Sequence, residues 1–184
     1  MTQLHSRFAA VLTMLAVTAT PLKSILEGHM SLHMLVQFPA LVAAGWMAVP
    51  SPCAGRLLSA VDAHGLLCGT VTSCVLAVWM IPAALDLSLL NPVVAAIKYA
   101  SWMTVGGMLS SSRIRFEPVI AAFFLFNAAW MMLTAGVIYG DNMLQLCVNY
   151  LVDDQVMTSR GLIALGLALI ALAAFNLRDL VASD

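Results

Sequence analysis

One stretch decides the fold: PVIAAFFLFNAAWMMLTAGVIY, which runs from Pro118 to Tyr139 and contains no charged side chain. About 20 apolar residues in a helix are enough to cross the hydrocarbon core of a bilayer. Because lipid offers no partner to backbone N–H and C=O groups, a spanning segment must be a helix or part of a closed barrel. Barrel strands alternate in polarity, whereas this stretch is apolar throughout, so we predict a transmembrane helix.

The rest of the chain has the same character. It is 62% hydrophobic and 9% charged, whereas soluble domains have about 45–50% and about 25%. The apolar blocks predict an all-α polytopic transmembrane bundle of about six spans, forming a single integral membrane domain over residues 1–184. The expected spans are Phe8 to Leu22, His29 to Val49 with a kink at Pro39, Leu57 to Ala84, Pro92 to Leu109, Pro118 to Tyr139, and Gly161 to Leu177.

The connections are short, and their charges predict an orientation. Positively charged residues favour the cytoplasmic side. With six spans, one side of the membrane carries Arg7, Arg56, Arg113, Arg115 and Arg178. We therefore expect both termini in the cytoplasm of a bacterium and an acidic outer side facing the periplasm. The first apolar block suits a retained helix better than a cleaved signal peptide, because a second apolar block follows it closely.

The segment GHMSLHM, from Gly28 to Met34, carries the strongest chemical signal. His29 and His33 are four residues apart and so share one face of a helix, and Met30 and Met34 repeat this spacing. Imidazole and thioether groups together suit copper, above all Cu(I). The alternative is two histidines at the membrane interface that only form hydrogen bonds with neighbouring helices.

A few other residues within the expected spans also carry a structural signal. A lysine in a membrane is usually paired, so we expect Lys98 either to pair with Asp86, Asp153 or Asp154 or to extend to the interface. Asn127 is expected to form a hydrogen bond between helices, and Gly65 and Gly69 to form a packing surface.

A bound haem is less well supported than copper. Haem b would need axial ligands at one depth, and His64 lies far from His33 along the membrane normal in the expected topology.

The four cysteines form no CxxC pair, so they indicate no zinc or redox motif. No nucleotide-binding or hydrolase motif is present, so no catalytic activity is predicted. A net charge of −1 gives no basic surface for nucleic acid.

Several of these motifs, taken in order, resemble the CtaG-type cytochrome c oxidase assembly proteins. The first match runs from Thr20-Pro21-Leu22 through GHMSLHM to Pro39. The second is WMIPAALD, from Trp79 to Asp86, and it continues over Pro92 to Met103. The third is Asp154-Gln155, followed by Gly161 before a final helix.

The resemblance implies a role in maturing the copper centre of haem-copper oxidases. It makes His29, Met30, His33, Met34 and Met80 the expected metal-handling residues, with Asp154 near them. The match is incomplete, because the family's histidine before the proline is Met80 here. Two further histidines of the family are replaced by Ala95 and Tyr99, with Lys98 beside them.

The alternative function is a small accessory subunit of a larger respiratory or oxygenase membrane complex, either purely structural or binding haem or quinone. In either case we expect other integral membrane subunits as partners.

Overall fold

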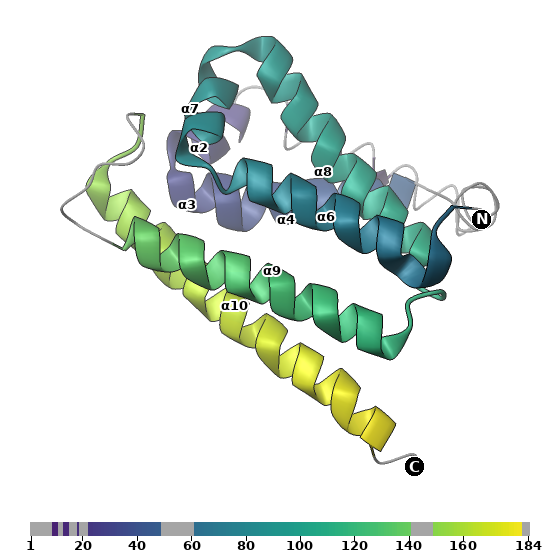
Figure 1. Cartoon of the computed structure of the whole chain (residues 1–184). Helices are drawn as coiled ribbons and strands as arrows, with labels where there is room; N and C mark the ends of the chain where they lie inside the picture. Colours follow the sequence, from purple (N-terminus) through teal and green to yellow (C-terminus); the bar gives the residue numbers. More distant parts are fainter. Residues whose placement is uncertain are drawn as a thin grey trace.

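The computed structural model describes residues 9–10, 13–14, 18, 22–48, 61–140 and 149–181, and in these residues every regular element is helical. Figure 1 shows the helices packed into one bundle. The elements are α2 (Leu22–Gly28), α3 (Met30–Leu32), the π-helical turn η1 (His33–Gln37), α4 (Phe38–Ala48), the 3₁₀ turn η2 (Ala63–Gly65), α6 (Leu66–Trp79), α7 (Pro82–Leu90), α8 (Pro92–Ser112), α9 (Pro118–Tyr139) and α10 (Val152–Val181).

Three of the helical stretches are long and apolar enough to cross a membrane: Met30–Ala48, Pro118–Tyr139 and Val152–Arg178. A fourth candidate is the pair Ala63–Trp79 and Pro82–Leu90, which is bent by 76° at the break after Trp79, so the span expected from Leu57 to Ala84 is interrupted near its end. The bend arises because Pro82 cannot continue the hydrogen-bond ladder of α6. The part of the chain that the structure describes is therefore all-helical and has three candidate membrane spans, or four if the bent pair is one span, as in an integral membrane protein.

The other two expected spans stay predictions. The first falls mostly on residues that the structure does not describe. The fourth corresponds to α8, which has 21 residues but carries a buried lysine and a run of serines, and it does not count among the sufficiently apolar helices.

Prolines set several helix boundaries. Pro92 and Pro118 are the first residues of α8 and α9, as expected, because proline needs no N–H partner at that position. Pro39 was expected to kink the second span. The structure instead places the π-helical turn η1 two residues before Pro39, where the widened turn accommodates the missing N–H donor.

Glycines allow the helices to approach closely. A Cβ atom on Gly106 of α8 would lie 2.0 Å from the carbonyl oxygen of Val42, so α8 and α4 touch backbone to backbone. Of the expected packing surface, Gly69 of α6 lies against the Phe124 ring of α9, whereas Gly65 lies in the turn before α6, against the Phe116 ring of the α8–α9 connection. Asn127 of α9 donates a hydrogen bond of 2.9 Å to the Ser73 hydroxyl of α6, which confirms its interhelical role.

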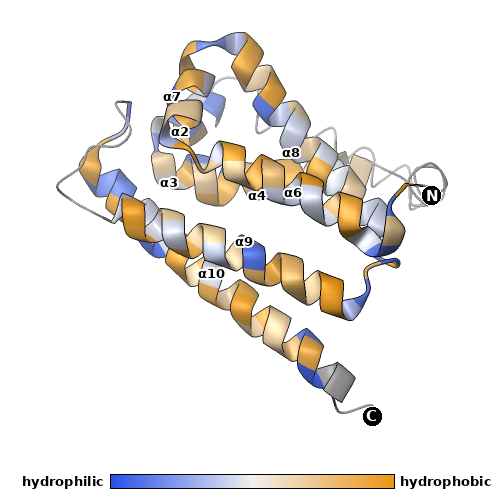
Figure 2. Cartoon of the chain, viewed as in Figure 1, coloured by the Kyte–Doolittle hydropathy of each residue, from blue (hydrophilic) through white to orange (hydrophobic). Residues whose placement is uncertain are grey.

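The two ends of the bundle differ in what they hold. One end carries the α8–α9 connection and the end of α10, and Arg113, Arg115 and Arg178 lie in these segments (Figure 1). The opposite end gathers α2, α3, α7 and the start of α10. Figure 2 shows that hydrophilic residues concentrate towards these two ends, whereas the middles of α9 and α10 are largely hydrophobic. Arg7 and Arg56 lie outside the described residues.

The α4–α8 crossing makes a prediction about stability. The substitution Gly106→Ala would place a methyl group against the backbone of α4, with its Cβ 2.0 Å from the Val42 oxygen and 2.8 Å from the Trp46 nitrogen. We expect the free energy of unfolding in detergent micelles to fall by about 1–3 kcal/mol, as in other overpacked sites. Gly28→Ala is the matched control, because no atom lies within 4 Å of its added Cβ. Equal stability of the two variants would contradict the close approach of α4 and α8.

Candidate functional site

A fully buried lysine organises the end of the bundle at which α2 and α3 lie. Lys98, on α8, is 0% exposed, and its Nζ atom lies 2.9 Å from Oε1 of Glu27 and 2.8 Å from Nε2 of His33. Of the two expectations for Lys98, pairing or extension to the interface, the structure shows pairing. The expected partners were wrong, because the carboxylate comes from α2, while Asp86 accepts a hydrogen bond from Asn149 and Asp154 binds elsewhere.

His33 is held from both sides of its ring. The ammonium group of Lys98 has only donors, so Nε2 of His33 accepts a hydrogen bond from it. The ring proton is then on Nδ1, which donates to the hydroxyl oxygen of Tyr150 at 2.6 Å. Both nitrogens of this buried imidazole are therefore engaged, because Nδ1 carries the proton and the lone pair of Nε2 accepts from Lys98, so no lone pair is available to a metal ion in this arrangement.

Glu27 is the acceptor at which most of the cluster converges. Its carboxylate accepts hydrogen bonds from Lys98, from the Tyr99 hydroxyl and, at 3.3 Å, from Gln37, and Lys23 lies 3.8 Å from the other oxygen. Burial alone would raise the pKa of this carboxyl. The hydrogen bonds from Tyr99 and Lys98, together with the positive charge of Lys98, outweigh burial and hold the pKa of Glu27 below its usual value.

A second carboxylate fixes the start of the helix that carries His33. Asp154, near the start of α10, accepts hydrogen bonds from the backbone N–H of Met30 and from the backbone N–H (3.4 Å) and hydroxyl (2.7 Å) of Ser31. His29 stands at the N-cap position but makes no capping bond with its side chain. Asp154 therefore satisfies the exposed N–H groups and complements the helix dipole. This contact brings the third sequence motif against the first.

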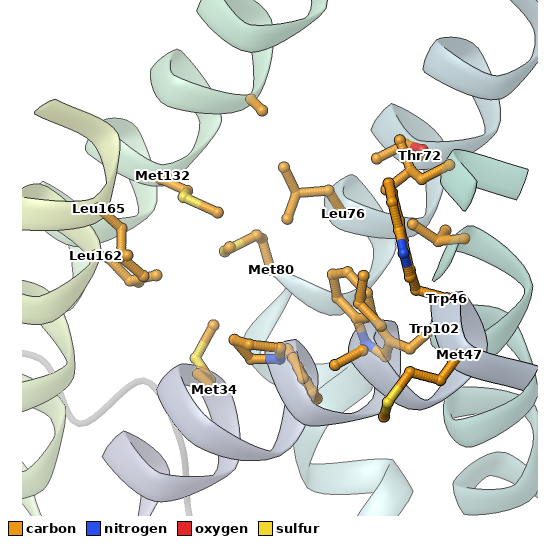
Figure 3. A pocket seen from close by; sticks show the side chains of 17 residues that line it. Met34, Trp46, Met47, Thr72, Leu76, Met80, Trp102, Met132, Leu162 and Leu165 are labelled. Carbon is orange, nitrogen blue, oxygen red and sulfur yellow. The ribbon is translucent and has the colours of Figure 1, made fainter. Parts of the chain in front are cut away.

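Beside the polar cluster lies an apolar cavity of about 490 Å³. Its lining residues come from η1, α4, α6, α8, α9 and α10, and it includes four methionines, Met34, Met47, Met80 and Met132. Figure 3 shows the side chains of Met80 and Met132 directed toward each other, with Met34 on the same side of the cavity and Met47 at its far end.

The structure divides the five predicted metal-handling residues among different surroundings. His29 has a side chain that is 63% exposed and lies 3.8 Å from Asp154. His33 is in the polar cluster, and Met30 is buried in the core without lining the cavity. Only Met34 and Met80 lie together, in the cavity wall.

The other candidates lie elsewhere. In the described part of the chain, no three His, Cys, Asp or Glu side chains come together as a metal site. His64 is exposed in the turn before α6, in a left-handed conformation with φ of 56°.

Sequence reasoning missed Glu27, Tyr99 and Tyr150 as members of the site. A signal for Glu27 existed, because it immediately precedes the GHMSLHM segment on the acidic outer side, where the partners of Lys98 were sought. Tyr99 directly follows Lys98 but was read only as a lost histidine. Tyr150 had no local signal, because it lies in a connection whose path depends on the whole bundle.

The ion pair predicts strong coupling between two positions. Lys98→Met should lower the free energy of unfolding by about 3 kcal/mol or more, because Glu27 would remain buried without its main counter-charge. The double variant Lys98→Met with Glu27→Gln should lose less than the sum of the two single losses. Lys23→Met is the control, with an expected loss of at most about 1 kcal/mol, because Lys23 is partly exposed and 3.8 Å away. Additive losses in the double-mutant cycle would show that Lys98 and Glu27 are not paired.

The lowered pKa of Glu27 predicts the direction of the pH dependence. A carboxyl whose pKa is lower in the folded than in the unfolded state stabilises the fold above its unfolded pKa. This stabilisation is lost as the pH falls through the folded pKa, which lies below 4.5. We expect the unfolding temperature in detergent to be insensitive to this group from pH 7 to pH 5 and to fall below that. Glu27→Gln should flatten the acid limb, and an unchanged limb would remove Glu27 as its cause.

Comparison of the chain with protein-family models, with curated proteins and with solved structures gives no match.

Proposed function

We propose that this protein is an integral membrane factor that handles copper for the maturation of haem-copper oxidases, as the resemblance of its motifs implies. It would have no catalytic activity of its own. In this proposal the bundle has about six spans and lies in a bacterial inner membrane with both termini in the cytoplasm. The polar cluster and the part of the cavity that holds Met34, Met80 and Met132 would then lie towards the periplasmic side.

The single observation that carries the proposal is the meeting of motifs that are far apart in the sequence. Asp154 binds the backbone at Met30 and Ser31, so the third motif contacts the first. Met34, from the first motif, and Met80, from the second, line the same cavity. Chance matches would be scattered over the bundle, whereas these matches meet at one end of it.

The local chemistry suits a soft metal ion. Thioethers are soft ligands that select Cu(I), and the cavity offers them in apolar surroundings. The backbone position of Met80 is fixed, because its carbonyl oxygen accepts a hydrogen bond of 2.7 Å from the Tyr139 hydroxyl of α9. A copper ion held at the outer side of the membrane would be close to where an oxidase receives it.

A second candidate function is a small accessory subunit of a larger membrane complex. The observation that favours it is that both ring nitrogens of His33 form hydrogen bonds, with Lys98 and Tyr150, so the imidazole has a structural role. In that case the polar cluster would hold the bundle together for docking on other integral subunits.

A gene deletion in the source organism tests the copper function. We expect the copper content of the purified haem-copper oxidase to fall in the deletion strain while its haem content stays unchanged, because only metal delivery is lost. Metal analysis and a reduced-minus-oxidised spectrum measure both quantities, and the intact gene should restore them. Normal copper content, combined with stable co-purification of this chain with another complex in mild detergent, would favour the accessory subunit instead.

A further inference from the structure

We infer that copper(I) binds in the methionine-lined cavity through the thioethers of Met34, Met80 and Met132, and that the histidines of the GHMSLHM segment are not its ligands. This inference rests on the proposed copper function and assigns it a different site from the one that the sequence suggested.

The first step concerns His33. Its Nε2 atom faces the Lys98 ammonium at 2.8 Å, so a fixed positive charge already stands where a metal ion would have to bind. A second cation there would meet like-charge repulsion in a buried site, where electrostatic interactions are strong. The other nitrogen is bound to Tyr150. The Lys98 ammonium group thus occupies the position between Glu27 and His33 that a metal ion would need.

The second step concerns His29. It lies at the beginning of the helix with a largely exposed side chain, next to Asp154, and not in the cavity wall. One exposed imidazole beside one carboxylate supplies too few soft donors to retain copper(I).

The third step concerns the thioethers themselves. Met34 comes from η1, Met80 from the end of α6 and Met132 from α9, so three elements each supply one sulfur atom to the same cavity. In Figure 3 these three side chains lie on one side of the cavity. Methionine side chains are flexible and polarisable, so they can converge on a soft ion of single charge. The cavity wall is dominated by apolar residues and so disfavours the hard cations that need several oxygen ligands.

A second cavity suggests how the ion reaches this site. It has a volume of about 310 Å³, is lined by Met131 and Tyr139 among others, and shares Met80 with the larger cavity. Met80 lies at the bend between α6 and α7, where the chain turns by 76°. Thioethers therefore follow one another from Met131 through Met80 to Met132, which allows ligand exchange in steps.

A copper(I) competition titration tests the inference. The full-length protein in mild detergent, kept reduced and free of oxygen, would compete with a coloured copper(I) chelator such as bicinchoninate. We expect about one ion per chain, with donors of the soft type. Each of Met34→Leu, Met80→Leu and Met132→Leu should weaken binding by at least about tenfold, since even changes outside the ligand shell cost 10–100-fold. The triple variant should not bind.

The controls separate the site from the fold. Leucine has nearly the volume of methionine, so these variants should keep their helicity by circular dichroism. Met103→Leu on α8 is the matched control, because Met103 is partly buried but does not line either cavity, and His29→Ala tests the exposed imidazole. Both should bind like the unmodified protein.

The outcomes distinguish the inference from the function. Copper(I) binding that survives the three methionine changes but is lost in His29→Ala would overturn the cavity site and leave the copper function standing. No uptake by the unmodified protein, with a lipid chain found in the cavity by native mass spectrometry, would overturn both.

Discussion

The structure depends on one buried ammonium group. Lys98 is fully buried in a bundle of largely apolar helices, where a charge without partners is very costly. The ammonium group pairs with Glu27 from α2 and donates a hydrogen bond to His33 from η1. His33 in turn donates a hydrogen bond to Tyr150, just before α10. The neighbouring segments α2 and η1 and the distant residue Tyr150 are thus fixed around α8 at one end of the bundle. Removing any one of them would leave a polar group buried without its partner.

This constraint also shapes the chemistry that remains. A histidine bound to an ammonium group and a tyrosine cannot serve as a metal ligand, so the donors still available beside the cluster are thioethers. Met34 is one residue from His33, and the widened turn η1 carries both, one facing the polar cluster and the other the apolar cavity. Asp154 holds the start of the same helix. The polar cluster and the cavity are therefore two sides of one short segment, and the cluster fixes the position of the cavity wall.

Much of the architecture could be predicted from the sequence, and the site only in part. Long apolar blocks and prolines at helix starts identified α9, most of α10 and the beginning of α8, and the cost of a buried charge indicated pairing as one of two expectations for Lys98. The start of α10 was wrong, because the helix begins at Val152, nine residues before the expected Gly161. The partner could not be predicted, because Glu27 is 71 positions away and only the folded path of α2 brings it close. The spacing of four residues between His29 and His33 predicted one shared site. The helix begins at His29 and widens at His33, so the two side chains end in different surroundings, one exposed and one fully buried.

X-ray absorption at the copper edge of the protein loaded with copper(I) tests the central claim most directly, namely that Lys98 has taken the place of a metal ion at His33 and has left copper to the thioethers. The account predicts a nearest shell of sulfur atoms alone, without the multiple-scattering pattern of imidazole rings, and a spectrum that does not change in His29→Ala. Clear imidazole scattering from the loaded protein would contradict it, because a histidine would then have to leave its present contacts to bind the metal.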